Sequence, residues 1–274
     1  MMSIKQFLAN AFDQLFPEKE VDIDLNYQHS PAWPLEWYKG MIKTQNRMGV
    51  MFTDFGPAER QFIQLAKTAK KPLLDIGCAY GAATRAALLS DRARITACDI
   101  DKEHLDYLRE AIPEEWHSRL RTTTQRFPNQ LSFPADSLSG ILMANVINYL
   151  KPDEITEGFK KCFDWLAPGG TLWVCAYTPY FNTYQRFDAL YDENVKQGKT
   201  FPCEFNPHEV SEQAWNQHSP DYMQIFKQEA LEHLLKKAGF EINESRYFAY
   251  EFVHRWLKNY SDKEFVMVAA KKPS

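Results

Sequence analysis

Residues 72–81 read Pro-Leu-Leu-Asp-Ile-Gly-Cys-Ala-Tyr-Gly, and this stretch decides the fold. An apolar run ends at Gly77, and an Ala-rich segment with a helical pattern follows over 81–90. Small residues at 77, 79 and 81 let the backbone pass close to a ligand and present its amide N–H groups. The stretch therefore predicts a buried strand, a tight turn with room for a ligand, and a helix.

Short apolar runs alternate with helical patterns from this turn to the C-terminus. The predicted strands are 72–77, 94–99, 120–127, 140–146, 171–176, 241–249 and 263–270. The predicted helices follow 81–90, Leu105 to Ile112, Pro152 to Leu166 (stopped by Pro168-Gly169-Gly170) and Leu231 to Gly239. Such alternation is typical of helices wrapped around a parallel sheet. The predicted fold is α/β, a doubly wound, mostly parallel seven-stranded sheet flanked by helices.

Two segments fall outside this alternation. Residues 1–57 hold an amphipathic helical pattern (Leu8, Ala11, Phe12, Leu15) and then an aromatic stretch. Residues 177–225 follow the fifth strand and include a helical pattern from Phe187 to Val195. A connection of that length in a compact domain is usually functional. We predict an N-terminal helical and aromatic extension over 1–57 and a main domain over 58–274. Within that domain, 177–225 is the predicted cap insertion over the substrate.

The composition is that of an ordinary soluble globule. Of 274 residues, 45% are apolar and 25% charged, and the net charge is −4. This charge gives no field for nucleic acid, and no apolar run reaches the ~20 residues that span a bilayer. The first sixteen residues lack the apolar core of a secretory signal. Five cysteines without a C-x-x-C spacing favour a reducing, cytoplasmic location and no metal site.

An aspartate at the end of the second strand indicates the kind of ligand. Asp99 stands twenty-two residues beyond Gly77, and neighbouring parallel strands bring such positions together. A carboxylate there can accept hydrogen bonds from both hydroxyls of a ribose. Asp75 would repel a pyrophosphate but suits an ammonium or sulfonium group, and the full G-x-G-x-x-G pattern is absent. The ligand should carry a ribose and a positive charge, which disfavours a nicotinamide dehydrogenase.

Together with later stretches, these residues resemble the class I S-adenosylmethionine-dependent methyltransferases. The matching stretches are 75–81, Asp99, 131–150, Leu166-Ala-Pro-Gly-Gly-Thr-Leu and Leu234-Leu-Lys-Lys-Ala-Gly-Phe-Glu-Ile, scattered over about residues 70 to 270. The resemblance implies S-adenosylmethionine (SAM) as the cofactor. It implies that Asp75 lies near the methionine amino group and that Asn145 offers a backbone carbonyl. The turn beneath the cofactor would be formed by Gly77, Cys78, Ala79 and Gly81. Asp99 would bind the ribose, and Ile100 would pack on the adenine.

The sequence departs from the family pattern at two positions. Ala79 replaces the usual middle glycine, a change that still leaves room for the ligand. Phe127 stands where an acidic residue often holds the adenine amino group, so ring stacking or a neighbouring loop would have to hold it.

No catalytic signature is visible. Residues 144–149 lack the Asn/Asp-Pro-Pro-aromatic run of enzymes that methylate planar amino nitrogens. His208 and His218 in the insertion are candidate bases, and His254 is a further one. Asn148 and Tyr149 either reach a substrate or pack at the start of the next helix. We expect His29, His104, His117 and His233 to lie on the surface.

The long aromatic segments are the predicted acceptor site. Trp37, Tyr180 and Tyr184 are candidate substrate-binding residues. Their rings form either a cover over a small apolar, planar or cationic acceptor or the private core of an added layer. The predicted function is methyl transfer to a small molecule by direct in-line displacement. Alternatives are a protein acceptor, or a sensor or inactive subunit that binds the cofactor without catalysis. The sequence leaves the oligomeric state open.

Overall fold

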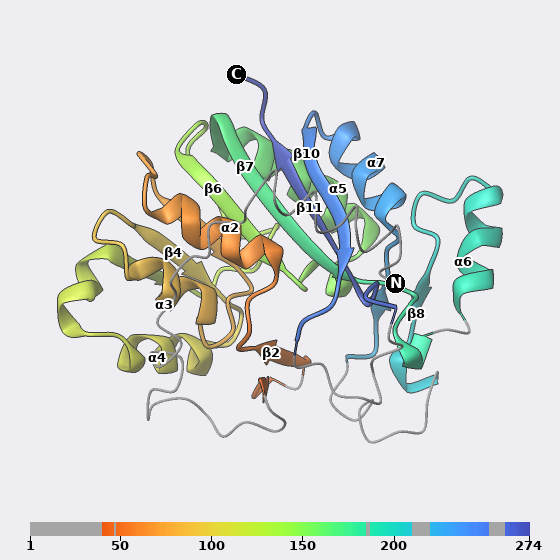
Figure 1. Cartoon of the computed structure of the whole chain (residues 1–274), viewed down its shortest axis with the longest axis horizontal. Helices are drawn as coiled ribbons and strands as arrows, with labels where there is room; N and C mark the ends of the chain where they lie inside the picture. The colour runs from red at the N-terminus through yellow and green to blue at the C-terminus, as the bar shows by residue number, and fades with distance from the viewer. Residues whose placement is uncertain (1–39, 47, 185–186, 210–219, 252–260) are drawn as a thin grey trace, which may run out of the picture.

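A seven-stranded sheet forms the centre of the computed structural model (Figure 1). The structure describes residues 40–46, 48–184, 187–209, 220–251 and 261–274. The strand order is β10-β11-β7-β6-β3-β4-β5, and only β11 runs against its neighbours. The strands are β3 (Leu73–Ile76), β4 (Ile95–Cys98), β5 (Leu120–Thr123), β6 (Leu138–Ala144), β7 (Leu166–Tyr177), β10 (Glu241–Phe248) and β11 (Phe265–Lys271). The predicted mostly parallel seven-stranded sheet is confirmed.

Helices cover both faces of this sheet because successive side chains of its central strands are apolar and point to opposite faces. Leu73 belongs to the core on one face and Leu74 to the core on the other. The first face packs against α2 (Pro57–Ala66), α3 (Ala82–Leu88) and α4 (Lys102–Ala111). The second packs against α5 (Pro152–Trp165) and α7 (Gln228–Lys237). The molecule is therefore a three-layer α/β structure, and α2 is a helix that the sequence analysis did not predict.

Two strands differ from their predicted bounds by more than two residues at one end. Strand β5 ends at Thr123, because the Thr123 hydroxyl accepts a hydrogen bond from the backbone N–H of Gln125 at 3.2 Å and turns the chain. Strand β7 begins at Leu166, before the glycine pair, because Gly169 and Gly170 bond to the backbone of Lys272 at 2.9 Å. Gly169 has φ +78°, a conformation that favours glycine.

A small hairpin lies beyond the carboxyl ends of the central strands (Figure 1). Its strands are β1 (Met41–Lys43) and β2 (Val50–Phe52), paired antiparallel with Met41 opposite Phe52. We call residues 41–46 and 48–52 the cover hairpin. It falls inside the segment that was predicted as a helical and aromatic extension. The predicted helix from Leu8 to Leu15 lies outside the described residues.

The segment after β7 forms a small layer of its own at the side of the sheet (Figure 1). It holds α6 (Phe187–Lys196), which confirms the helical pattern predicted there, and the two-stranded pair β8 (Glu204–Phe205) and β9 (Met223–Gln224). Short 3-10 turns occur at Glu114–Arg119, Ile147–Tyr149, Asn182–Tyr184 and Pro207–Glu209. In the part of the chain that the structure describes, no helix has the length and apolar character to cross a membrane.

Candidate active site

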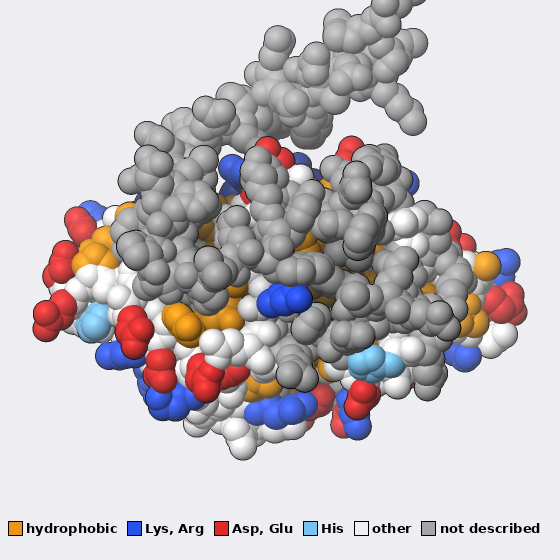
Figure 2. Space-filling model, turned by 90° about the horizontal axis from the view of Figure 1, so that it is seen from below, with side chains coloured by type: hydrophobic (Ala, Val, Ile, Leu, Met, Phe, Trp, Pro, Cys, Tyr) orange, Lys and Arg blue, Asp and Glu red, His pale blue; other side chains and the backbone are white. Residues whose placement is uncertain are grey.

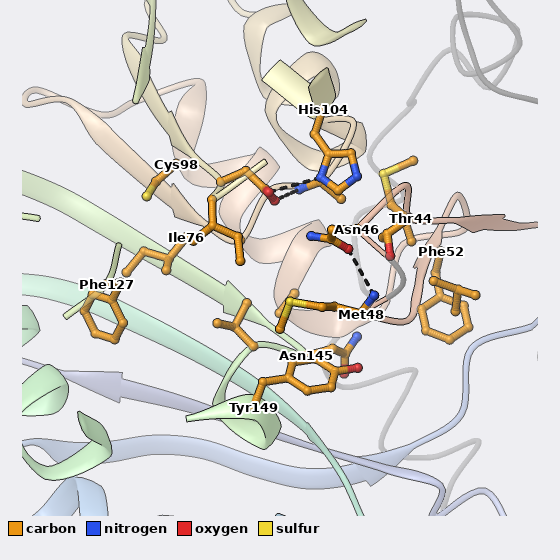
Figure 3. A pocket seen from close by; sticks show the side chains of 18 of the residues that line it. Thr44, Asn46, Met48, Phe52, Ile76, Cys98, His104, Phe127, Asn145 and Tyr149 are labelled. Carbon is orange, nitrogen blue, oxygen red and sulfur yellow. Dashed lines mark hydrogen bonds and ion pairs between the residues drawn. The ribbon is translucent and has the colours of Figure 1, made fainter. Parts of the chain in front are cut away.

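A cavity opens at the carboxyl ends of β3, β4 and β6, where the strand order reverses direction (Figure 3). Ligands of doubly wound sheets bind at such a switch point. The cover hairpin closes part of it with Thr44, Asn46, Met48, Val50, Met51 and Phe52. The sheet side is lined by Ile76, Gly77, Ala79, Cys98, Asp99, Ile100, Phe127, Ala144, Asn145, Val146, Tyr149 and Tyr177. Phe127 and Phe52 lie at opposite ends of the cavity (Figure 3).

Three donors fix the carboxylate of Asp99, which is 7% exposed. One oxygen accepts from the backbone N–H of Ala79 at 2.8 Å. The other accepts from the backbone N–H of Asp101 at 2.9 Å and from His104 Nδ1 at 3.0 Å. Each carboxylate oxygen has two lone pairs, so the oxygen that accepts only from Ala79 keeps one for a ligand, and a second ribose hydroxyl would share the oxygen that already has two donors. The site holds a pre-oriented anionic acceptor at the predicted ribose position.

The glycine turn approaches the cavity with no side chain in the way. Gly77 has φ +69°, and a Cβ added there would lie 2.3 Å from Val146 Cγ2. Ala79 also has a left-handed backbone, with φ +46°, yet its methyl group fits. Gly81 begins α3 as its N-cap, with φ +78°. Only Gly77 and Ala79 of these three line the cavity in the described part of the chain.

His104 is completely buried, so the prediction that it lies on the surface was wrong. Its Nε2 accepts a hydrogen bond from the backbone N–H of Gln45 at 3.1 Å, so the proton must reside on Nδ1, which donates to Asp99. Tyr80 makes a second hydrogen bond to the cover hairpin, because its hydroxyl donates to the carbonyl of Lys43 at 3.0 Å. His104 thus connects the cover hairpin to Asp99, the side chain that is predicted to bind the ribose.

This link leads to a testable expectation for His104→Ala. Losing a hydrogen bond to a charged group costs roughly 1.5–3 kcal/mol, so we expect about tenfold weaker binding of S-adenosylhomocysteine by calorimetry. The backbone amide of Gln45 should also exchange faster with deuterium, since it loses its acceptor. His233→Ala removes an exposed histidine and is the matched control. Unchanged affinity together with unchanged exchange in residues 41–52 would show that His104 positions neither group.

Asp75 and Cys78 lie behind the cavity wall. Asp75 Oδ2 accepts from the Thr84 hydroxyl of α3 at 2.7 Å, and the carboxyl is 3% exposed. The pKa of Asp75 is raised to about 7, chiefly by burial and in smaller part by the nearby carboxyls of Glu59 and Asp99, although the Thr84 hydrogen bond acts to lower it. Burial also holds the pKa of the Cys78 thiol well above its usual range, so this cysteine is no nucleophile. A positive ligand group next to Asp75 would restore its ionised form.

The remaining predicted cofactor residues line the cavity. Phe127 is 5% exposed and packs edge-on against Trp165, with ring centroids 6.3 Å apart. Ile100 is 49% exposed. Asn145 has φ +59°, and its Oδ1 is buried without a hydrogen-bond partner among the described residues. An orphaned acceptor of this kind suits a donor on a bound ligand.

The catalytic candidates separate into three cases. Asn148 is fully buried and hydrogen-bonds to Gln224 and Tyr177, so it connects the end of β7 to the end of β9. Tyr149 lines the cavity and is hydrogen-bonded to Tyr177. His208 pairs with the exposed Asp221 at 3.3 Å, and it does not line the cavity in the described part of the chain. His218 and His254 lie outside the described residues.

The structure places two of the predicted acceptor residues away from the cavity. Tyr184 is 3% exposed and packs edge-on against Phe205 at 5.2 Å. Tyr180 packs against Tyr247 at 5.5 Å. Among the described residues, neither lines the cavity, and Tyr184 belongs to the hydrophobic core on the first face of the sheet rather than to a private core. Trp37 lies outside the described residues.

Comparisons with known proteins agree with this geometry. Residues 73–170 match the family model described as a methyltransferase domain. No curated protein matches the sequence. A SAM-dependent methyltransferase from Methanosarcina mazei is similar in fold, with 20% identity, 80% of this chain and 99% of that chain covered, and a TM-score of 0.58. One from Mesorhizobium loti has 16% identity, covers 79% of this chain and 98% of its own, and has a TM-score of 0.54.

A third similar structure contains ligands. It is 1,6-didemethyltoxoflavin-N1-methyltransferase from Burkholderia thailandensis, with 1,6-didemethyltoxoflavin and S-adenosylhomocysteine bound. It has 17% identity, covers 80% of this chain and 79% of its own, and has a TM-score of 0.53.

The cavity fits the cofactor of this class. It offers a fixed anionic acceptor at Asp99 and a turn without a side chain at Gly77. Residues 73–170 therefore match a methyltransferase domain, and the fold is that of SAM-dependent methyltransferases.

Proposed function

We propose that this protein is a SAM-dependent methyltransferase and that it acts on a small molecule, which binds between the cofactor and the cover hairpin. The observation that carries this proposal is that the cover hairpin closes part of the cavity. Hydrogen bonds with His104 and Tyr80 connect this hairpin to the cofactor side. A covered cavity suits a small acceptor better than a side chain of a folded protein. The Burkholderia thailandensis protein indicates that this fold serves small acceptors.

The charge pattern around this face supports the same acceptor class. Figure 2 views the molecule from below, the side on which Figure 1 draws the cover hairpin. On the side chains described there, Lys and Arg are interspersed with Asp and Glu (Figure 2). A dedicated binder of nucleic acid would carry a basic patch instead. Five free, buried cysteines support a reducing location such as the cytoplasm.

The protein's part in the reaction is to orient and to exclude water. SAM supplies, when bound, a methyl group already activated on a sulfonium. The residues around it must hold the acceptor atom ~3–3.5 Å from the methyl carbon and in line with the breaking bond. Met48 and Phe52 of the hairpin line the cavity and, with Tyr149 and Tyr177, exclude water. In-line displacement needs no nucleophile from the protein.

The two tyrosines are poor bases in this position. Burial raises the pKa of Tyr177 to about 12, and it raises that of Tyr149 well above its usual range. Both phenols are therefore neutral near pH 7, where they donate or accept hydrogen bonds but do not take a proton from an acceptor.

Incubation with isotope-labelled SAM and a fractionated small-molecule extract tests the proposal. We expect label in a low-mass product, identified by mass spectrometry, and none with Asp99→Asn. Label confined to the protein fraction would point to a protein acceptor instead. Cofactor binding by calorimetry without label in any fraction would identify a non-catalytic binder.

A further inference from the structure

Glu59 places a buried carboxyl in the wall of the cavity. It lies in the first turn of α2, is 7% exposed and lines the cavity. Its Oε1 accepts a hydrogen bond from the Tyr250 hydroxyl at 2.5 Å. Its Oε2 is buried without a hydrogen-bond partner among the described residues. A buried carboxyl oxygen without a partner costs free energy unless a ligand satisfies it.

A short polar chain extends from this carboxyl into the cavity. Tyr250 Oη also accepts a hydrogen bond from Asn145 Nδ2 at 3.3 Å. Asn145 Oδ1 is the second buried acceptor without a partner. Glu59, Tyr250 and Asn145 therefore line one part of the cavity, where two buried acceptor atoms have no hydrogen-bond partner among the described residues. We call these three residues the Glu59 triad.

Aromatic rings surround the triad. Phe52 of the cover hairpin stacks on Tyr250 with ring centroids 4.3 Å apart and an interplanar angle of 7°. Tyr177 also lines this cavity. Ring faces attract cations, and the attraction increases where water is excluded. Carboxylate and aromatic groups together are a typical environment for a positively charged nitrogen.

The charges near Glu59 have no cation to balance them inside the cavity. The pKa of Glu59 is raised to about 7, chiefly by burial and in smaller part by the Asp54 carboxyl, although the Tyr250 hydrogen bond and Arg60 act to lower it. Asp75 and Cys175 are the other titratable groups that interact with it. Arg126 is the one Lys or Arg among the described lining residues, and it pairs with Glu154 at 3.2 Å. A ligand cation is the missing partner.

We propose that the substrate is an amine. Its protonated nitrogen binds to the Glu59 triad, and Glu59 takes its proton. This inference rests on the proposed function. Proton transfer from the ammonium to the carboxylate gives a neutral amine and a neutral acid. The amine lone pair then forms the nitrogen–carbon bond as the carbon–sulfur bond breaks and sulfur keeps its electron pair. Tyr250 of the triad stacks on Phe52, which lies at the end of the cavity opposite Phe127 (Figure 3), and we expect the acceptor there.

A matched pair of probes tests the proposal. Benzylamine and benzyl alcohol are similar in shape and differ in charge. Ligand-observed NMR measures how each binds to the full chain saturated with S-adenosylhomocysteine. We expect the wild type to bind the amine at least about tenfold more tightly. Glu59→Gln should reduce this preference to within about twofold. Because glutamine resembles the protonated carboxyl in shape and hydrogen bonding, the variant should fold, which a thermal melt checks.

Controls separate the amine from the cofactor's own ammonium group. Glu229→Gln removes a first-turn acid of α7 that is exposed, and it should keep the full preference. S-adenosylhomocysteine affinity should stay within about twofold in Glu59→Gln. A parallel loss of cofactor affinity would instead assign Glu59 to the methionine end and overturn the proposal. An equal affinity of the wild type for both probes would also overturn it.

Two further results keep the inference distinct from the proposed function. If the wild type binds no S-adenosylhomocysteine, the cofactor site itself is wrong and the triad has no role. If Glu59→Gln does not fold, Tyr250→Phe is the second variant, since it keeps the ring stacked on Phe52 and removes the donor to Glu59. It should lower the amine preference several-fold without changing cofactor affinity. An unchanged preference in Tyr250→Phe would then contradict the triad.

Discussion

Replacing Asp99 with asparagine is expected to weaken S-adenosylhomocysteine binding about 100-fold or more. A ribose held by the carboxylate makes two hydrogen bonds to a charged group, each worth roughly 1.5–3 kcal/mol. Every 1.4 kcal/mol changes affinity about tenfold. An asparagine also places an NH₂ group against at least one of the three donors that now hold the carboxylate. Isothermal titration calorimetry measures the loss.

Asp101→Asn is the matched control for this result. Asp101 caps α4, and its Oδ1 accepts from the backbone N–H of Glu103 at 2.9 Å. Asparagine caps helices about as well as aspartate, so this variant should fold and keep its cofactor affinity within a few-fold. Equal affinities of Asp99→Asn and the wild type would show that the ribose does not bind there.

Gly77→Ala should have the second large effect. The added Cβ would lie 2.3 Å from Val146 Cγ2, and the backbone has φ +69°. A left-handed alanine costs roughly 1–2 kcal/mol, and overpacking costs about 1–3 kcal/mol more. We expect chemical denaturation to show a loss of at least about 2 kcal/mol and calorimetry to detect no cofactor binding.

The neighbouring turn position provides the comparison. Ala79 already has φ +46°, so Ala79→Gly relieves a strained backbone and should leave both stability and cofactor binding close to those of the wild type. A normal melting temperature and normal binding in Gly77→Ala would mean that the turn does not approach the ligand as described.

The fold and the cofactor side of the site were predictable because their signals are local in the sequence. The stretch from Leu73 to Gly81 fixes a strand, a turn and a helix through neighbouring residues alone. Asp99 follows at the end of the next strand, and parallel pairing of β3 with β4 brings it to Ala79. Periodicity also gave the core, since Leu73 and Leu74 face opposite layers.

The acceptor side could not be read in the same way, because it depends on contacts between distant segments. His104 looked like a surface residue of an amphipathic helix, yet Gln45, 59 positions earlier, donates to it and buries it. Glu59 meets Tyr250 across 191 positions. Two signals were available: the apolar runs of the cover hairpin between Gly40 and Phe52, and the spacing of Ala58, Phe62, Ile63 and Ala66 after Pro57, which is typical of a helix.

The aromatic insertion shows why composition misleads. Tyr180 and Tyr184 follow the strand whose end faces the cavity, so a cover was a reasonable prediction. Rings of that size must be buried against something, and here Tyr184 packs against Phe181, Phe187 and Phe205, which extend the core on the first face of the sheet. A run of aromatics predicts a core but not which ligand, if any, that core faces.

The central claim is that the cavity holds an adenosyl group between the glycine turn and Asp99. A crystal structure of the full chain with S-adenosylhomocysteine tests it most directly. We expect both ribose hydroxyls on the Asp99 carboxylate, the adenine beside Ile100 and Phe127, and the methionine end toward Asn145. Density for the ligand at another place, or an unchanged empty cavity at saturating concentration, would contradict the account.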